Sequence, residues 1–363
     1  MEYRKRFEEI INHREADRVP FDFNGTALTA CMPEVTKKLA DYFSISADND
    51  AEAEEQIQKI FDIDFRKVGT LFFPDSEYAD RSKSGQYTDS WGIVRSFQGM
   101  YWDITYSPFR DMELRDLKSY KWPSVKGISR KLMDDITEKA KRLYNDTDYV
   151  VVAEHPVLGY LELGCWIFGF DDFLYRLLAE PETTGWFFEN YNKYVMDVNE
   201  LYYGNIGKYI HVTTSGDDFG TQNSLFMSPE VFAGDIVPWY KKRITDLKQY
   251  TDAKYFHHSC GSVYRILDNI IEMGVDILNP IQPGAFEMEP ERLKNEYGDK
   301  LTFWGGIDEQ VLLTTGTPEQ VINEVRRVNG ILNKDGGWVM SASHNLQPDV
   351  PVENIVAMFN ALR

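Results

Sequence analysis

The feature that most constrains the fold of this chain is a regular alternation of short apolar runs with helical patterns. Eight runs have the length and composition of strands buried on both faces of a parallel sheet. They cover residues 19–23, 64–71, 149–153, 209–214, 254–258, 276–279, 301–304 and 337–341. Helical patterns between them cover residues 129–144, 229–249, 263–273, 290–297, 318–332 and 351–362. Eight such alternations predict a (β/α)8 barrel, an α/β fold, and a doubly wound open sheet is the alternative.

Two segments interrupt this alternation. Residues 72–122 are rich in Tyr, Trp, Ser and Gly and carry short alternating runs, which predicts a β-hairpin insertion after the second strand. Residues 171–181 predict a helical insertion after the third strand. Loops of this kind commonly form the rim of a barrel site. The length of 363 residues suits a single barrel domain over residues 1–363 with its main insertion at about 72–122.

Composition excludes several classes of function. The net charge of −19 without a basic stripe argues against binding to a nucleic-acid backbone. No stretch approaches the roughly 20 apolar residues of a membrane span, and the charged, amphipathic amino terminus differs from a signal peptide. Three cysteines do not make a disulfide framework, which favours a reducing compartment. We therefore expect a soluble, cytoplasmic protein.

The sequence His258-Ser259-Cys260 lies where the fifth predicted strand ends. An imidazole and a thiol two positions apart point to the same side of an extended chain, and zinc binds both readily. His257 should then point out of the barrel wall. The alternative is plain packing, because a buried thiol beside a histidine is common in protein cores.

A second imidazole strengthens the metal hypothesis. His344 follows the eighth predicted strand, across the barrel mouth from the fifth, so that it can converge with His258 and Cys260. A catalytic zinc site needs three protein ligands and one open position, which these three residues would supply. Alternatively, His344 caps the last helix or binds a carboxylate.

Polar residues follow the other strands as well, at the end where barrels carry their catalytic groups. Those that we expect to contact substrate are Glu154, Asn279, Gln282 and Asp308. Asp217 and Asp218 could form a proton-handling pair in which one carboxylate raises the pKa of the other, or one of them could bind loop amides. Asp308 follows two glycines that let a ligand approach the backbone, but it could equally cap the next helical turn.

Six segments, in order along the chain, carry a resemblance to a known family. They are ADRVPFDF, FDIDFRKV, GDDFGTQNSLFMSPE, HHSCGSVYRILDNIIEMGVDILNPIQP, FWGGIDEQ and HNLQPDVPVENIVAMF. The chain resembles the uroporphyrinogen decarboxylase superfamily, especially its methyltransferase-like branch of corrinoid and thiol methyltransferases. In that branch a His-x-Cys pair binds zinc together with a later cysteine. His258 and Cys260 match the pair, whereas His344 holds the place of the later cysteine.

The resemblance implies a zinc-dependent enzyme that moves a methyl group between a corrinoid on a partner protein and a thiol or pterin acceptor. The alternative is metal-free decarboxylation of a tetrapyrrole, as in the decarboxylases, which carry a histidine near the position of His344. That reaction would use Asp64 or Asp218 to stabilise a protonated pyrrole, with Tyr160 and His344 on the substrate. However, the arginine-rich amino-terminal motif of the decarboxylases is missing around Arg18. A third possibility is a barrel that binds a small ligand without catalysis.

Overall fold

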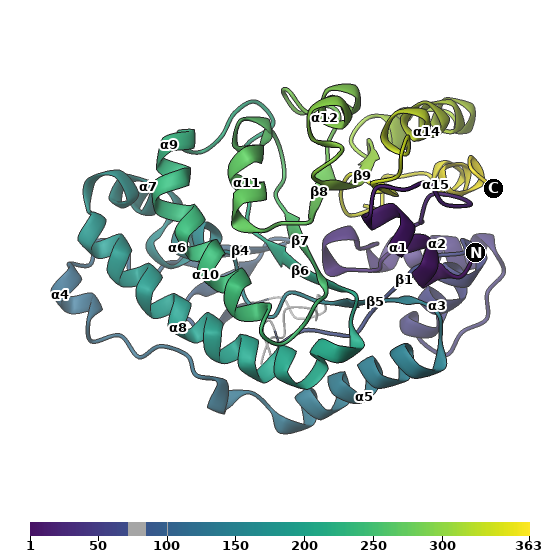
Figure 1. Ribbon diagram of the computed structural model, residues 1–363. Coiled ribbons are helices and arrows are strands. Elements are labelled where there is room, and N and C mark those ends of the chain that lie inside the picture. The colour runs from purple at the N-terminus through teal and green to yellow at the C-terminus, as the bar shows by residue number, and fades with distance from the viewer. Residues whose placement is uncertain (72–84, 100) are drawn as a thin grey trace.

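The computed structural model describes residues 1–71, 85–99 and 101–363, and its centre is a parallel sheet. Seven strands follow one another around this sheet in chain order, each parallel to the next (Figure 1). They are β1 (Phe65–Lys67), β5 (Val150–Ala153), β6 (Val212–Gly216), β7 (Lys254–His258), β8 (Ile277–Ile281), β9 (Thr302–Ile307) and β10 (Trp338–Ala342). Their short apolar sequences match the predicted strands.

The segment around Phe21 closes this sheet into a barrel. Phe21 forms a parallel bridge with Met340 of β10. The amide of Asp22 donates to the Met340 carbonyl at 2.9 Å, and the amide of Asp64, just before β1, donates to the Phe21 carbonyl at 3.0 Å. The first predicted strand therefore joins both edges of the sheet, although only Phe21 has regular bridge geometry. The prediction of a (β/α)8 barrel is confirmed, and the open-sheet alternative is wrong.

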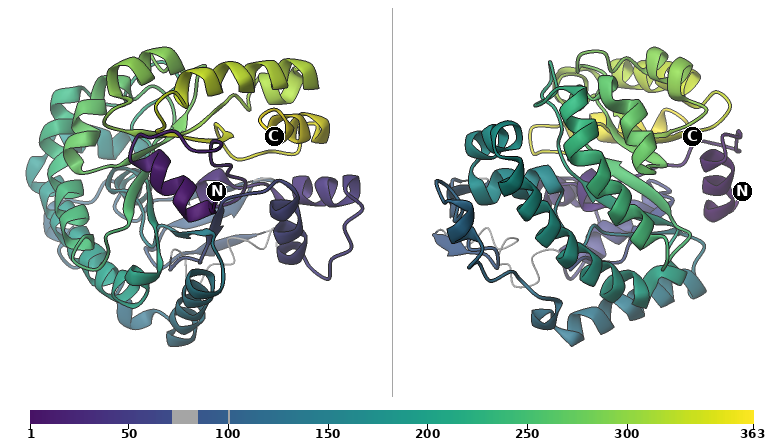
Figure 2. Two further views of the ribbon diagram at one scale, coloured as in Figure 1. Left: turned by 45° about the vertical axis from the view of Figure 1, so that its right-hand side comes forward. Right: turned by 60° about the vertical axis from the view of Figure 1, so that its left-hand side comes forward.

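Helices surround the strands on the outside of the barrel (Figure 2). Those that follow the strands are α2 (Pro33–Tyr42), α3 (Asp50–Ile60), α5 (Arg130–Asp146), α8 (Pro181–Ile206), α10 (Val237–Leu247), α11 (Leu267–Met273), α12 (Pro290–Tyr297), α14 (Pro318–Leu332) and α15 (Val352–Asn360). Thr317 caps α14, because its side chain accepts a hydrogen bond from the Gln320 backbone amide. The Gln320 side chain in turn accepts a hydrogen bond from the Thr317 backbone amide. Among the described residues, no helix has both the length and the apolar character that a membrane crossing requires.

Alternation along the strands separates the barrel interior from the helical layer. Apolar side chains fill the interior, and Phe7 and Ile11 of α1 (Tyr3–Ile11) pack against them. The interior side chains are Phe65, Val150, Val152, Val212, Phe256, Ile277, Trp304 and Val339. His257 points the other way, where its ring stacks on Phe219 with the ring centres 5.2 Å apart. The predicted assignment of His257 outward and His258 inward is confirmed.

The insertion after β1 forms an antiparallel sheet of its own. The described part contains β2 (Gln86–Thr88), β3 (Val94–Phe97) and β4 (Trp102–Tyr106), one strand more than the predicted hairpin. Residues 72–84 and 100 of the predicted insertion lie outside the described residues. The Phe109 amide donates to the Ile167 carbonyl of α6 (Tyr160–Phe168) at 2.8 Å. This bond connects the insertion to a helix that begins beyond the carboxyl end of β5. The predicted helical insertion corresponds to α7 (Phe170–Ala179).

Asp64 lies at the opposite end of the barrel from the expected site, because it precedes β1 rather than following it. Its fully buried carboxylate binds Arg6 at 2.6 Å and Arg18 at 2.8 Å, and it accepts the Phe21 amide at 2.8 Å. These bonds connect α1, the closing segment and β1. The expectation of a catalytic Asp64 is wrong, because its charge is used to hold the barrel closed.

We predict that Asp64→Ala lowers the free energy of unfolding by about 3–5 kcal/mol, because it leaves the buried Arg6 without this partner. Denaturant unfolding of the purified variant measures this change. Asp41→Ala, a similar loss of charge on the exposed side of α2, should stay within about 0.5 kcal/mol of the parent. A stable Asp64→Ala protein would contradict the structural role of Asp64.

Candidate metal centre

Three side chains from two distant strands meet at the carboxyl end of the barrel. His258 ends β7, Cys260 follows it by two residues, and His344 comes two residues after β10. One ligand atom of each lies within 4.8 Å of the others. The Cys260 Sγ lies 3.2 Å from the His258 Nε2, and the two imidazole ring centres are 5.8 Å apart. The predicted convergence is present in the structure.

The amide of Asn279 fixes which nitrogen of His258 faces this centre. The Asn279 Nδ2 donates to the Trp304 carbonyl at 3.2 Å, so its Oδ1 faces the His258 Nδ1 at 2.6 Å. The Nδ1 must therefore carry the proton, which leaves the lone pair of Nε2 directed at the thiol. Burial lowers the pKa of His258 and favours this neutral, metal-binding form. Asn279 was expected to contact substrate, but it is buried and positions His258 instead.

Hydrogen bonds with the loop after β6 hold the His258–Gly261 segment in place. The Ser259 hydroxyl accepts the Phe219 amide at 3.0 Å, which turns this side chain away from the centre. The Cys260 amide donates to the Asp218 Oδ1 at 2.7 Å. Gly261 has φ of +81°, and a Cβ there would lie 2.3 Å from the Thr221 carbonyl oxygen, so only glycine fits this turn.

The electrostatic surroundings of Cys260 favour a bound cation. Burial raises the pKa of the Cys260 thiol, and the carboxylates of Asp218 and Glu309 raise it further. The Asp218 Oδ1 also lies 3.9 Å from the His258 Nε2. A thiolate at this position is therefore unfavourable without a positive charge, whereas a divalent metal ion would reverse that balance. The three side chains together fit a metal ion by donor type, by spacing and by charge.

A pocket of about 460 Å³ opens beside this centre. The residues that line it are Gln222, Cys260, Gln282, Glu309, Gln310, Thr314, His344, Gln347, Asp349 and Val350. Gln282 was expected to contact substrate and does line the pocket, where its Oε1 accepts the Gly261 amide at 2.7 Å and the Gln222 Nε2 at 3.1 Å. Among the described residues, the wall of this pocket contains neither lysine nor arginine.

Glu309 is the buried carboxylate of this pocket that sequence reasoning missed. It follows β9 and is buried, and the Ser343 hydroxyl donates to its Oε2. Burial raises the pKa of Glu309, and the bond from Ser343 opposes that shift. The only signal in the sequence was its place after the seventh predicted strand. Asp308 shares that place, so the sequence did not distinguish the two carboxylates.

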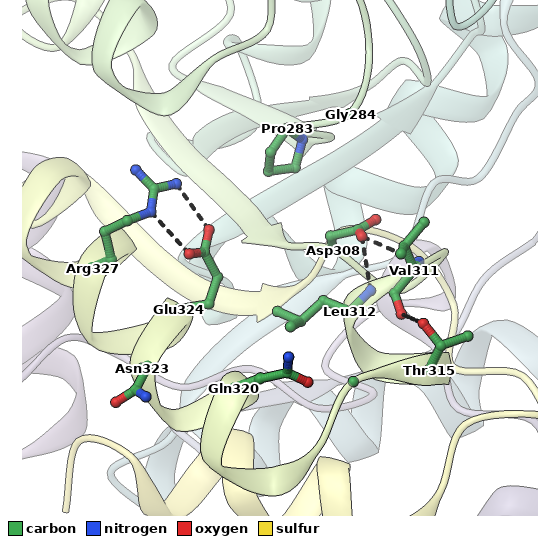
Figure 3. Close-up of a pocket in the computed structure, with 11 residues that line it drawn as sticks. Pro283, Gly284, Asp308, Val311, Leu312, Thr315, Gln320, Asn323, Glu324 and Arg327 are labelled. Atoms are coloured by element: carbon green, nitrogen blue, oxygen red, sulfur yellow. Dashed lines mark hydrogen bonds and ion pairs between the residues drawn. The ribbon is translucent and has the colours of Figure 1, made fainter.

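Asp308 belongs to a different pocket of about 730 Å³, shown in Figure 3. This second pocket lies between the loop after β8, α13 (Leu312–Thr315) and α14. The Asp308 carboxylate accepts the amides of Gln310, Val311 and Leu312 at 3.0–3.2 Å. The capping alternative for Asp308 is confirmed, and Asp308 does not line the pocket beside the metal centre.

Two other residues expected to bind substrate lie elsewhere. Tyr160 is fully buried in the helical layer, where its hydroxyl donates to the Asn192 Oδ1 at 2.6 Å. Glu154 follows β5 and is buried, with both carboxylate oxygens 3.0 Å from the Ala27 amide. Neither lines the pocket beside the metal centre. The structure thus gives both residues internal partners in place of the expected substrate contacts.

Asp217 and Asp218 bind different partners, although the Asp218 charge contributes to the raised pKa of Asp217. Asp217 is buried and accepts the amides of Leu161 and Glu162 at 2.9 and 2.8 Å, which anchors the start of α6. Burial raises the pKa of Asp217 to about 7. Asp218 instead projects toward Cys260 and His258. The structure therefore retains Asp218 as a candidate functional residue and assigns Asp217 to the scaffold.

Fold and site together define an α/β barrel with a candidate His/Cys/His metal centre at its carboxyl end. Residues 216–363 match the family model for uroporphyrinogen decarboxylase (URO-D), and this segment contains all three candidate ligands. Over these residues, the predicted resemblance to the uroporphyrinogen decarboxylase family is confirmed. None of the curated proteins matches the chain.

Comparison with solved structures shows a similar fold over nearly the whole chain. A methyltransferase from Methanosarcina mazei superposes with a TM-score of 0.66 at 12% identity, covering 99% of this chain and 98% of that protein. A putative vitamin-B12 independent methionine synthase from Listeria monocytogenes gives a TM-score of 0.44 at 11% identity, with 96% and 95% covered. At 12% identity, the likeness to the methyltransferase establishes a shared fold.

We predict that the parent protein binds zinc and that Cys260→Ser and His344→Ala each lose most of it, because two ligands hold the ion far more weakly than three. Elemental analysis after dialysis against zinc measures this loss. Cys165→Ser, the same chemical change at a buried cysteine of α6, should keep its zinc. Full zinc content in Cys260→Ser would reject this set of ligands.

We also predict that Asn279→Ala weakens zinc binding by about 10–100-fold, because it removes the acceptor that orients His258. Competition with a chelator of known affinity measures the change. Asn323→Ala, on the exposed side of α14, is the matched control and should bind zinc as the parent does. Unchanged affinity in Asn279→Ala would show that His258 needs no such orientation.

Proposed function

We propose that this protein is a zinc-dependent methyltransferase that moves a methyl group between a corrinoid and a thiol or pterin acceptor. The observation that carries the proposal is the meeting of His258, Cys260 and His344 within 4.8 Å beside a pocket. Three protein ligands with a neighbouring cavity are the arrangement of a catalytic zinc site, in which the fourth position takes substrate.

The donor set favours zinc among the common metals. Two imidazole nitrogens and one thiolate suit a tetrahedral zinc ion, whereas calcium and magnesium prefer oxygen ligands. Zinc bound there would lower the pKa of a thiol substrate so that it binds as the thiolate, the reactive nucleophile. Asn279 keeps the His258 lone pair available for the metal, and the pocket wall positions the rest of the acceptor.

For a thiol acceptor, the reaction is a direct displacement at the methyl carbon. The sulfur–carbon bond forms while the cobalt–carbon bond of the corrinoid substrate breaks, and the electron pair of that bond stays with cobalt. The proton of the thiol leaves to solvent. With zinc bound, His344 would be a neutral ligand where a thiolate would add negative charge, which would make the metal more strongly electrophilic and a thiolate acceptor less nucleophilic. This effect favours a pterin as the second acceptor to test.

The methyl donor in this proposal is a corrinoid carried by a partner protein. The superfamily resemblance supports this part of the proposal. The partner itself would have to present the corrinoid at the carboxyl end of the barrel, because the candidate ligands and their pocket lie there.

Several observations disfavour the decarboxylase alternative. A tetrapyrrole with many carboxylates needs fixed cations, and the described wall of the pocket has no lysine or arginine. Arg18 lies at the other end of the barrel with Asp62 and Asp64. Two of the residues named in that scheme, Asp64 and Tyr160, are buried and do not line the pocket, although His344 does.

We predict that the zinc-loaded protein demethylates methylcobalamin when 2-mercaptoethanol or tetrahydrofolate is present, which the change in cobalamin absorbance measures. Cys260→Ser should lower the rate by more than the roughly 10–100-fold typical of outer-shell changes, because it removes a ligand. Cys165→Ser is again the control. Loss of carboxylates from uroporphyrinogen, or undiminished methyl transfer by zinc-free Cys260→Ser, would contradict the proposed function.

A further inference from the structure

We propose that the pocket beside the metal centre excludes anionic substrates and takes a methyl acceptor whose distal end is neutral or positively charged. The inference rests on the proposed function, since it concerns the substrate of the same pocket. It goes further by assigning a charge class to the end of the acceptor that lies away from the metal.

The wall of the pocket provides hydrogen bonds and negative charge. Four of its residues are glutamines, one is a threonine, and two, Glu309 and Asp349, are acidic. Gln282 and Gln222 bind each other at 3.1 Å, and the Gly261 amide holds Gln282 at 2.7 Å, so these two carboxamides have fixed positions. A fixed polar wall of this kind recognises donors and acceptors on a substrate and offers no ion pair to an anion.

The acidic side chains lie on more than one side of the centre. Glu309 is buried in the wall of the pocket, where its Oε2 accepts a hydrogen bond from the Ser343 hydroxyl. Asp349 is exposed near the mouth, and Asp218 contacts the Cys260 amide. Opposite charges attract more strongly, and like charges repel more strongly, where protein replaces water. An anionic group placed among these carboxylates would therefore be repelled.

Nearby cations are engaged with other partners. Lys67, at the carboxyl end of β1, donates to the Asn24 Oδ1 at 2.6 Å and lies 3.7 Å from Glu54. Arg265, in the turn before α11, binds Glu287 at 2.8 Å. Neither side chain lines the pocket. The described residues thus give a sulfonate, phosphate or carboxylate no counter-charge within the pocket.

The two ends of the acceptor meet opposite charges. The reactive end lies at the metal, where a thiolate is compensated by the ion. The distal end lies against glutamine and carboxylate side chains. An amine or hydroxyl group there gains hydrogen bonds or charge attraction, whereas a sulfonate meets only repulsion and amide dipoles.

Three thiols with the same two-carbon skeleton test this inference. They are 2-mercaptoethylamine, 2-mercaptoethanol and 2-mercaptoethanesulfonate, and isothermal titration calorimetry of the zinc-loaded protein gives their dissociation constants. We expect the amine and the alcohol to bind at least about tenfold more tightly than the sulfonate. The difference should shrink as salt is added, because salt screens charges near solvent.

Variants that each neutralise one carboxylate identify the residues that produce the preference for the amine over the sulfonate. Glu309→Gln and Asp349→Asn should each narrow the difference between the amine and the sulfonate severalfold, with zinc content verified for both. Asp252→Asn is the matched control, since it removes an exposed carboxylate from the loop before β7, at the opposite end of the barrel. If the ratio of the dissociation constants of the sulfonate and the amine changes equally in Asp252→Asn, overall charge rather than this pocket sets the preference. That result would overturn the inference.

The remaining outcomes separate this inference from the proposed function. Equal or tighter binding of the sulfonate, with methyl transfer intact, overturns the charge preference and leaves the methyltransferase proposal standing. Binding in the expected order without any methyl transfer supports the charge preference and contradicts the proposed function. Failure of the zinc-loaded protein to bind any of the three thiols overturns the charge preference.

Discussion

The closure of the sheet by the segment around Phe21 is the constraint on which the rest of the structure depends. Backbone hydrogen bonds join this segment to Met340 of β10 on one side and to Asp64 on the other. The buried Asp64 carboxylate, with Arg6 and Arg18, holds the same junction at the far end. A closed sheet curves, so the ends of β7 and β10 face each other across one mouth. Without that curvature, two intervening strands would separate His258 from His344.

Within this mouth, neighbouring strands prepare the candidate ligands. β8 lies beside β7 in a register that pairs His258 with Asn279, so the carboxamide reaches the imidazole at 2.6 Å. The loop after β6 supplies Asp218 to the Cys260 amide. These contacts favour the neutral form of the His258 imidazole. They also place the Cys260 thiol, whose deprotonation is unfavourable, beside a negative charge. The site is therefore arranged for a cation, and its polar groups are less well satisfied without one.

The acidic side chains near the metal centre also influence which substrates the pocket can accept. Glu309 raises the pKa of the Cys260 thiol and also forms part of the pocket wall. The chain has 58 acidic and 39 basic residues, and two cations at the carboxyl end of the barrel, Lys67 and Arg265, are paired with other side chains. One set of carboxylates would thus favour a cation at the candidate metal centre and account for the expected rejection of anionic acceptors.

The sequence by itself determined the barrel and its three candidate ligands. Alternating apolar runs located the seven strands of the parallel sheet and the closing segment around Phe21, and strand parity directed His258 inward together with Cys260. Parity applies only while the backbone stays extended. Beyond the strand ends, loop geometry decided which carboxylate faces the pocket, so Glu309 lines it while Asp308 caps a turn. Tertiary partners decided the roles of Asp64, Tyr160 and Asn279, because a buried polar group must bond to whatever the fold brings beside it, and that neighbour is distant in the sequence.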